Sequence, residues 1–184
     1  MILAAAFLAL PAAAADRPAP EPWRVSLRVS AAPGVAERDR AAFERRLVVG
    51  LTEPLCGIEL ARDGTEAEAE LEVTLERWRE RRRPGGAAVF DPNTGRDRPG
   101  EIWEVEVRYR YALTRRGERK PVLRRSRKSL VRSASTSNPL WDPHRQARRR
   151  ALDESAEEIA RATCKARRKV KPGKARGEEG RPRN

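Results

Sequence analysis

Trp103-Glu-Val-Glu-Val-Arg-Tyr-Arg-Tyr-Ala-Leu113 is the stretch that decides the fold class of this 184-residue chain. Apolar or aromatic side chains alternate with charged ones through most of it, which is the period of a β-strand with one buried and one solvated face. Residues 23–31 and 67–75 alternate in the same way. The sequence therefore predicts a sheet that is covered by other elements on one face only.

Two other segments have the period of an amphipathic helix. The first spans about residues 36–53, and the second begins at Asp142, the expected N-cap, and reaches about Ala166. Their expected inner stripes are Phe43, Leu47 and Leu51 in the first helix and Leu152, Ala156, Ile159 and Thr163 in the second. Both helices are predicted to pack on the same face of the sheet.

Short or irregular patterns complete the chain. Residues 58–60 and 121–135 are expected to be strands, the second cation-rich as edge strands often are. Residues 82–100 contain so many Pro and Gly residues that we expect a long loop. Trp78 departs from the alternation, which indicates a bulge, a strand end or an exposed side chain. The resulting prediction is an α+β two-layer sandwich, a mainly antiparallel sheet of four to five strands with two helices on one face.

The N-terminal residues have the composition of a secretory signal. They are uncharged and end in Ala13-Ala14-Ala15, a small-residue cleavage pattern, and the run is too short to cross about 30 Å of hydrocarbon. We expect residues 1–15 to be a signal peptide, 16–22 a lead-in, 23–166 a single domain and 167–184 a disordered basic tail. The mature chain is then periplasmic or secreted, without a transmembrane segment. A different start of the chain and an uncleaved anchor remain alternatives, because no Lys or Arg precedes the apolar run.

The chain is strongly basic, with a formal net charge of +13. Its last twenty residues contain nine basic and two acidic side chains. In an envelope compartment, such segments are attracted to phosphorylated glycolipids, acidic phospholipids and cell-wall carboxylates. Nucleic acid is the expected partner only if the signal-peptide assignment is wrong. Base composition of the genome is an alternative explanation for the abundance of Arg.

Cys56 and Cys164 are the two cysteines of the chain. A lone pair in an oxidising compartment predicts a disulfide, and the proposed sandwich lets both helices end at the same edge of the sheet, where the two residues would meet. Neither cysteine lies in a CxxC motif, and there is one histidine, so neither a redox site nor a zinc site is predicted. We expect no cofactor.

The order of elements resembles that of small envelope accessory proteins, in particular the LptE family of lipopolysaccharide-assembly lipoproteins. Residues 23–31, 43–51, 101–135 and 152–163 carry the resemblance. It implies a scaffold or binding role at the envelope and transfers no binding residue. The expected cleavage point has no cysteine, so the lipid anchor of that family is not expected here.

Candidate binding residues lie in and beside the expected loop and in the tail. Arg79, Arg81, Arg82 and Arg83 form a basic cluster suited to bidentate phosphate binding, with a solvated strand end as the alternative. Phe90 is expected either to insert into a partner or membrane surface or to fold back over the core. The tail adds Arg167, Arg168, Lys169 and Lys171. We predict a non-enzymatic accessory protein that engages an anionic envelope component or a partner protein.

Enzymatic function is the competing hypothesis. His144, the single histidine, lies in the first turn of the second helix without a GxSxG motif, where a solvated side chain is expected. A carboxylate-dependent hydrolase would use a pair from Glu68, Glu70, Glu72, Glu104 and Glu106. We expect these to pair across strands with Arg24, Arg28, Arg108 and Arg110 instead. Residues 91–95 lack the spacing of a calcium loop. No catalytic or metal-binding residue is predicted.

Overall fold

The computed structural model describes residues 22–53, 56–61, 66–136, 138 and 140–169. The expected signal peptide, most of the lead-in, residues 62–65 and the tail from residue 170, with Lys171, lie outside the described residues. The elements are, in chain order, β1 (Trp23–Ala31), α1 (Glu37–Leu51), β2 (Ile58–Leu60), β3 (Ala69–Pro84), β4 (Val89–Asp91), β5 (Arg96–Arg98), β6 (Glu101–Arg115), β7 (Leu123–Ala134) and α2 (Pro143–Lys169).

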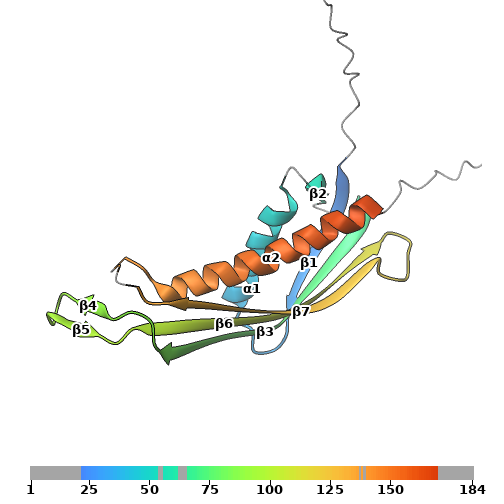
Figure 1. The fold of residues 1–184 in the computed structure, drawn as a ribbon. Helices are drawn as coiled ribbons and strands as arrows, with labels where there is room; N and C mark the ends of the chain where they lie inside the picture. The colour runs from blue at the N-terminus through green and yellow to red at the C-terminus, as the bar shows by residue number, and fades with distance from the viewer. Residues whose placement is uncertain (1–21, 54–55, 62–65, 137, 139, 170–184) are drawn as a thin grey trace, which may run out of the picture.

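The predicted α+β two-layer architecture is confirmed. The main sheet has five strands in the order β2-β1-β3-β6-β7. β1 is parallel to β2 and to β3, whereas the longer ladders β3–β6 and β6–β7 are antiparallel. Both helices lie on the same side of this sheet (Figure 1). The opposite side, which we call the outer face, is left to solvent.

The core lies between the helices and the inward-facing half of each strand. Val105, Val107 and Leu113 of β6 are fully buried, as the alternation predicts. The ring of Phe43 from α1 packs on that of Tyr109 at a centroid distance of 6.1 Å. The predicted inner stripes are buried, apart from Leu152, which lies at the edge of the core and is partly exposed. Leu152 borders an open groove between the two helices.

A β-bulge explains why Trp78 departs from the alternation of the strand. The β3–β6 register shifts between Leu75 and Arg77, so Trp78 returns to the helix side and packs against the core. The strand then continues to Pro84, well beyond the predicted end. Arg82 and Arg83 therefore belong to β3 and not to a loop. The physical reason is the 15-residue β6, whose backbone groups pair with β3 along its whole length.

The expected loop is instead a small hairpin. β4 and β5 pair antiparallel as a separate two-stranded sheet that extends beyond the main sheet (Figure 1). The breakers concentrate at its turns, where Gly86 and Gly95 have φ values of +82° and +65°. Oδ1 of Asp91 accepts the backbone N–H of Asn93 at 2.9 Å, so this carboxylate closes a turn. The prediction of a structureless loop was wrong.

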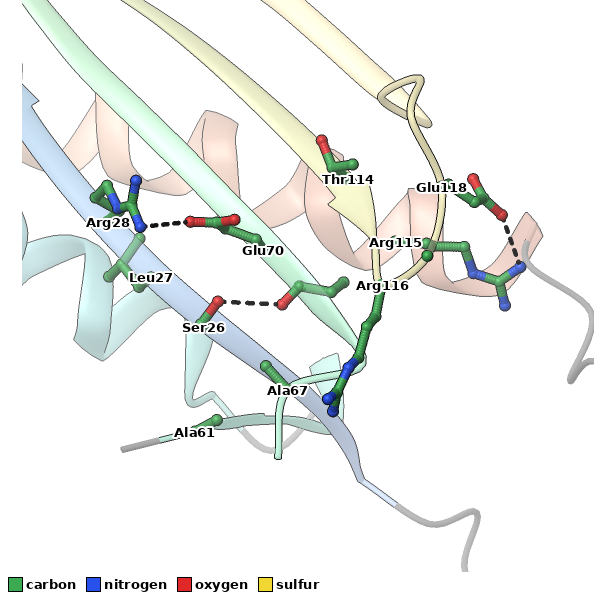
Figure 2. Close-up of a pocket in the computed structure, with 12 residues that line it drawn as sticks. Ser26, Leu27, Arg28, Ala61, Ala67, Glu70, Thr114, Arg115, Arg116 and Glu118 are labelled. Carbon is green, nitrogen blue, oxygen red and sulfur yellow. Dashed lines mark hydrogen bonds and ion pairs between the residues drawn. The ribbon is translucent and has the colours of Figure 1, made fainter. Parts of the chain in front are cut away.

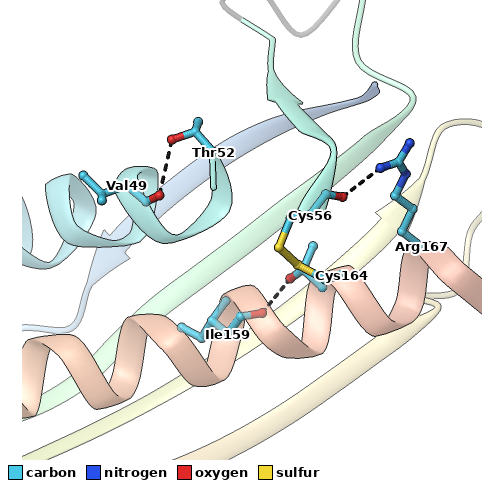
Figure 3. The surroundings of a disulfide bond; sticks show 7 residues. Val49, Thr52, Cys56, Ile159, Cys164 and Arg167 are labelled. Atoms are coloured by element: carbon cyan, nitrogen blue, oxygen red, sulfur yellow. Dashed lines mark hydrogen bonds between the residues drawn. A yellow bond between two sulfur atoms is a disulfide. The ribbon is translucent and has the colours of Figure 1, made fainter. Parts of the chain in front are cut away.

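The predicted disulfide is confirmed. Cys56 and Cys164 are bonded, with their Cα atoms 5.2 Å apart, and they join the segment after α1 to the last turns of α2 (Figure 3). Nη1 of Arg167 donates to the carbonyl oxygen of Cys56 at 2.7 Å. α2 therefore continues to Lys169, and the predicted start of the tail at residue 167 is corrected. The bridge and this hydrogen bond hold the helix end against the sheet.

None of the helices in the described part of the chain is both long enough and apolar enough to span a membrane.

Candidate anion-binding site on the outer face of the sheet

Beyond the bulge, β3 presents every second side chain to the outer face. Arg79 and Arg81 lie opposite Glu106 and Glu104 of β6 in the register. β7 adds Arg132 opposite Glu104. We call this region the basic face. Its members are Arg77, Arg79, Arg81, Arg83, Arg108, Lys128 and Arg132 around Glu104 and Glu106.

The two carboxylates of the basic face are covered by cations. Glu104 is 6% exposed, and its carboxylate lies 2.8 Å from Nε of Arg132 and 3.5 Å from Nη2 of Arg83. Glu106 pairs with Arg108 at 2.8 Å and with Lys128 at 3.3 Å. Burial raises the pKa of Glu106, but hydrogen bonds from Lys128 and Arg108 lower it by more, and the net shift is downward. The cations around Glu106 therefore favour its carboxylate form.

Cations exceed carboxylates on this face. Arg79 and Arg81 are exposed, and neither has an acidic partner within ion-pair distance among the residues that the structure describes. A small depression of about 200 Å³ is lined by these two arginines together with Lys128 and Arg132. Leu130, 46% exposed, lies in its lining. The arrangement is chemically suited to bind several phosphate or carboxylate groups at once.

The predicted arginine cluster is divided by the strand. Arg79, Arg81 and Arg83 share the basic face, whereas Arg82 is on the helix side, where its Nη2 lies 2.8 Å from Glu101. Sequence reasoning missed Lys128 and Arg132, because the register of β7 decides which of its cations reach the outer face. The cation-rich composition of 124–132 was the available signal.

The other predicted binding residues lie elsewhere. Phe90 is 57% exposed on the β4–β5 hairpin, so it does not fold back over the core. Arg167 and Arg168 are in the last turns of α2, at the end of the molecule opposite the hairpin (Figure 1). Lys169 is the last residue of that helix. The basic face, the hairpin and the helix end are thus three separate places.

His144 belongs to a network on the helix side. Its Nε2 lies 2.6 Å from Oε2 of Glu80, and its ring packs on Trp103 at a centroid distance of 4.2 Å. Arg148 donates to Oε1 of Glu80 at 2.7 Å and to buried Asp39 at 2.5 Å. The expectation of a simply solvated histidine was wrong. These contacts connect β3, α2 and α1, and their role is structural.

The pKa of Glu80 follows from these contacts. Burial raises it, but hydrogen bonds from Trp78 and His144 and the charge of Arg148 lower it by more, so the pKa lies below its ordinary value. Oε1 of Glu80 accepts from Trp78 and Arg148, each at 2.7 Å, and Oε2 contacts His144, so both oxygens are engaged. The described hydrogen-bond partners of Glu80 are Trp78, His144 and Arg148, and none of these carries the hydroxyl or thiol of a nucleophile.

A second hollow of about 540 Å³ lies at the opposite end of the outer face (Figure 2). Two of its arginines are paired with lining carboxylates, Arg28 with Glu70 at 3.2 Å and Arg115 with Glu118 at 3.6 Å. The expected cross-strand pairs are confirmed for two of the candidate hydrolase carboxylates, Glu70 and Glu72, which both pair with Arg28. Glu104 pairs across strands with Arg83 and Arg132, which were not the expected partners, and Glu106 pairs with Arg108 of its own strand. Within the described ranges, no cluster of three His, Cys, Asp or Glu is arranged to hold a metal ion.

No family model matches the chain, and no curated protein sequence matches it. Solved structures with a similar fold include a DUF330 protein of Xanthomonas campestris, at 13% identity and a TM-score of 0.52 over 81% of this chain and 87% of the other. A Chlamydia trachomatis protein matches at 10% identity and a TM-score of 0.50, over 78% and 99% of the two chains. A minor lipoprotein of Acinetobacter baumannii has 16% identity and a TM-score of 0.46, over 78% and 94%.

These similarities place the chain in a structural class. The first two show a shared two-layer fold, and at such identities they show the fold alone. Bacterial lipoproteins are among the proteins of similar structure, but the similarities do not single out the LptE family. The candidate site therefore has to be interpreted from its own residues.

Proposed function

We propose that this protein is a non-enzymatic accessory protein of the bacterial cell envelope, and that it binds an anionic envelope component through the basic face. The observation that carries the proposal is the pair Arg79 and Arg81. Both are exposed beside Lys128 and Arg132, and among the residues that the structure describes neither Arg79 nor Arg81 has an acidic partner. Arginine side chains of this kind form strong, bidentate hydrogen bonds with phosphate and carboxylate.

The shape of the basic face favours an extended ligand. Side chains on one face of a strand recur about every 7 Å, and neighbouring strands are about 5 Å apart. Cations on such a grid can contact several anionic groups of a surface or polymer, whereas the depression of about 200 Å³ is smaller than a usual small-molecule pocket. Leu130 adds an exposed apolar contact in the middle. A membrane or glycolipid surface with anionic headgroups has this chemistry.

The disulfide and the N-terminal sequence support a location in the cell envelope. A structural bridge between Cys56 and Cys164 is stable in an oxidising space and is rare where glutathione keeps thiols reduced. The signal-like residues 1–15 agree with that compartment. In the envelope, nucleic acid is not an available partner, and phosphate and carboxylate groups of lipids and cell wall are.

The experiment is co-sedimentation of residues 16–184 with phosphatidylcholine vesicles that contain or lack phosphatidylglycerol. We expect binding only to the anionic vesicles, and the apparent affinity should fall as the salt concentration rises, because the contacts are electrostatic. Equal binding to both vesicles, or no binding to the anionic ones at low salt, would contradict the proposal. The same assay with the isolated tail peptide, residues 170–184, separates the contribution of the tail from that of the domain.

A further inference from the structure

A groove of about 740 Å³ runs between α1 and α2 on the side of the molecule that faces away from the sheet. The helices approach closely at one end, where a Cβ on Gly50 would lie 3.4 Å from that of Ala160. Elsewhere they are joined by Arg46–Asp153 at 2.5 Å and by Arg148–Asp39 at 2.5 Å. The groove is therefore a fixed feature of two packed helices.

The apolar part of the groove lining is small and comes from both helices. α1 contributes Ala42 and Val49, which are seven residues apart, and α2 contributes Leu152. Val49 is 51% exposed. The other lining residues are charged or polar. A groove between two packed helices, with an apolar side chain on each wall, can accept a third helix that packs an apolar stripe of its own.

The rim of the groove is cationic. Arg45 and Arg145 are exposed and have no ion-pair partner in the described ranges, and Arg149 has only a 3.8 Å contact with Asp153. The two acidic residues of the lining are already engaged. Asp153 pairs with Arg46, and Oδ1 of Asp142 accepts the backbone N–H of Arg145 at 3.0 Å. Anionic groups of a bound partner would meet unneutralised arginines on both walls.

From this complementarity we propose that the groove docks an acidic amphipathic helix of a partner protein. The partner helix would place aliphatic residues at i, i+3 or i+4 and i+7 on Val49 and Leu152, with Asp or Glu flanking them toward Arg45 and Arg145. A second copy of this chain is disfavoured as occupant, since the chain carries a net charge of +13. The groove is on the opposite side of the molecule from the basic face, so both surfaces can be occupied together.

The test uses two synthetic helical peptides with the same leucine stripe, one with Glu and one with Lys at all flanking positions. Binding to residues 16–184 is measured by fluorescence anisotropy. We expect saturable binding of the Glu peptide only. Arg45→Glu/Arg145→Glu should weaken it by at least about tenfold, because these two charges face the partner. The matched control Arg150→Glu/Arg161→Glu, exposed on α2 outside the groove, should leave it unchanged.

Three results would overturn the inference. They are no saturable binding of the Glu peptide up to about 1 mM, equal binding of both peptides, and undiminished binding to Arg45→Glu/Arg145→Glu. A photo-crosslinker at position 49 gives an independent readout in cells. A crosslink to an acidic amphipathic segment supports the inference, and a crosslink to lipid or to a second copy refutes it. Because vesicle binding is measured separately, this inference and the proposed function can fail independently.

Discussion

Nε of Arg132 lies 2.8 Å from the nearly buried carboxylate of Glu104, and so joins β7 to the middle of the basic face. The same carboxylate lies 3.5 Å from Nη2 of Arg83 on β3. Glu104 thus holds cations of two different strands in place across β6. It also subtracts one charge from a surface proposed to bind anions, and these two roles can be separated experimentally.

Glu104→Gln should weaken folding and strengthen anion binding. The substitution keeps the side-chain volume but removes a charge that has two arginine partners, so the free energy of unfolding should fall by about 1 kcal/mol, a modest value because both arginines are more than half exposed. The affinity for anionic vesicles should rise about fivefold, since one repulsive charge is lost. Urea unfolding and co-sedimentation measure the two effects. A parallel loss of both would contradict this account of Glu104.

Removal of the disulfide should destabilise the domain without changing its fold. The bridge closes a loop of 108 residues, and Cys56→Ser/Cys164→Ser is expected to lower the free energy of unfolding by about 2–5 kcal/mol. Urea unfolding with and without reductant measures this. Reductant should destabilise the natural chain and leave the double variant unaffected. If reductant has no effect on the natural chain, the bridge does not form.

Glu158 should give the stability a distinct pH dependence. Burial raises the pKa of Glu158, but hydrogen bonds from Tyr109 and Arg127 lower it by more, so its folded pKa lies below its ordinary value. Its stabilising contribution is therefore present above about pH 4, the range of an unfolded Glu, and is lost as the pH falls through the lowered folded pKa. Glu158→Gln should show a smaller loss of unfolding free energy between about pH 5 and pH 2, whereas the exposed Glu154→Gln should behave as the natural chain.

Tyr109 and Tyr111, whose hydroxyls contact the carboxylate of Glu158, should make the stability decline at alkaline pH. Burial first, and then hydrogen bonding to Glu158, raise the pKa of Tyr109, and burial and the charge of Glu158 raise that of Tyr111. Their contribution is complete below the unfolded tyrosine value of about 10 and declines as the pH rises above it. Tyr109→Phe should flatten the alkaline decline of the unfolding free energy. An unchanged decline would show that other groups cause it.

Phe90 should matter little for folding. It is 57% exposed on a hairpin that pairs only with itself as a two-stranded sheet. Phe90→Ala is therefore expected to change the free energy of unfolding by less than about 0.5 kcal/mol. A loss of several times this amount, measured by urea unfolding, would mean that Phe90 packs on the domain after all.

The fold could be predicted where a pattern was local. The alternation in 103–113 and the stripe of Phe43, Leu47 and Leu51 depend only on the period of a strand or helix, and both are confirmed. The disulfide could also be predicted, because two cysteines allow one pairing. The length of β3 could not be predicted from the sequence. The arginine-rich run before Pro84 has no alternation of apolar and polar residues, and the ladder to β6 determines its conformation.

The site was harder to predict, because it depends on contacts distant in sequence. Glu80 and His144 are 64 positions apart, and no local pattern places them together. Arg82 was grouped with Arg81 and Arg83, yet the bulge after Leu75 fixes the parity that directs Arg82 to the helix side. Arg132 joined the basic face only through the β6–β7 register. Such assignments require knowing which residues of neighbouring strands lie opposite each other.

The most direct test of the central claim is the affinity of Arg79→Glu/Arg81→Glu for phosphatidylglycerol vesicles at low salt, compared with Arg150→Glu/Arg161→Glu. Both variants change the net charge equally, and in each the altered side chains are exposed. If the basic face binds the anionic surface, the first variant should lose at least about thirtyfold in affinity, as each lost cation near a headgroup surface costs about 1 kcal/mol, and the second should bind almost normally. An equal loss in both variants would show that only net charge matters and that the basic face is not a binding site.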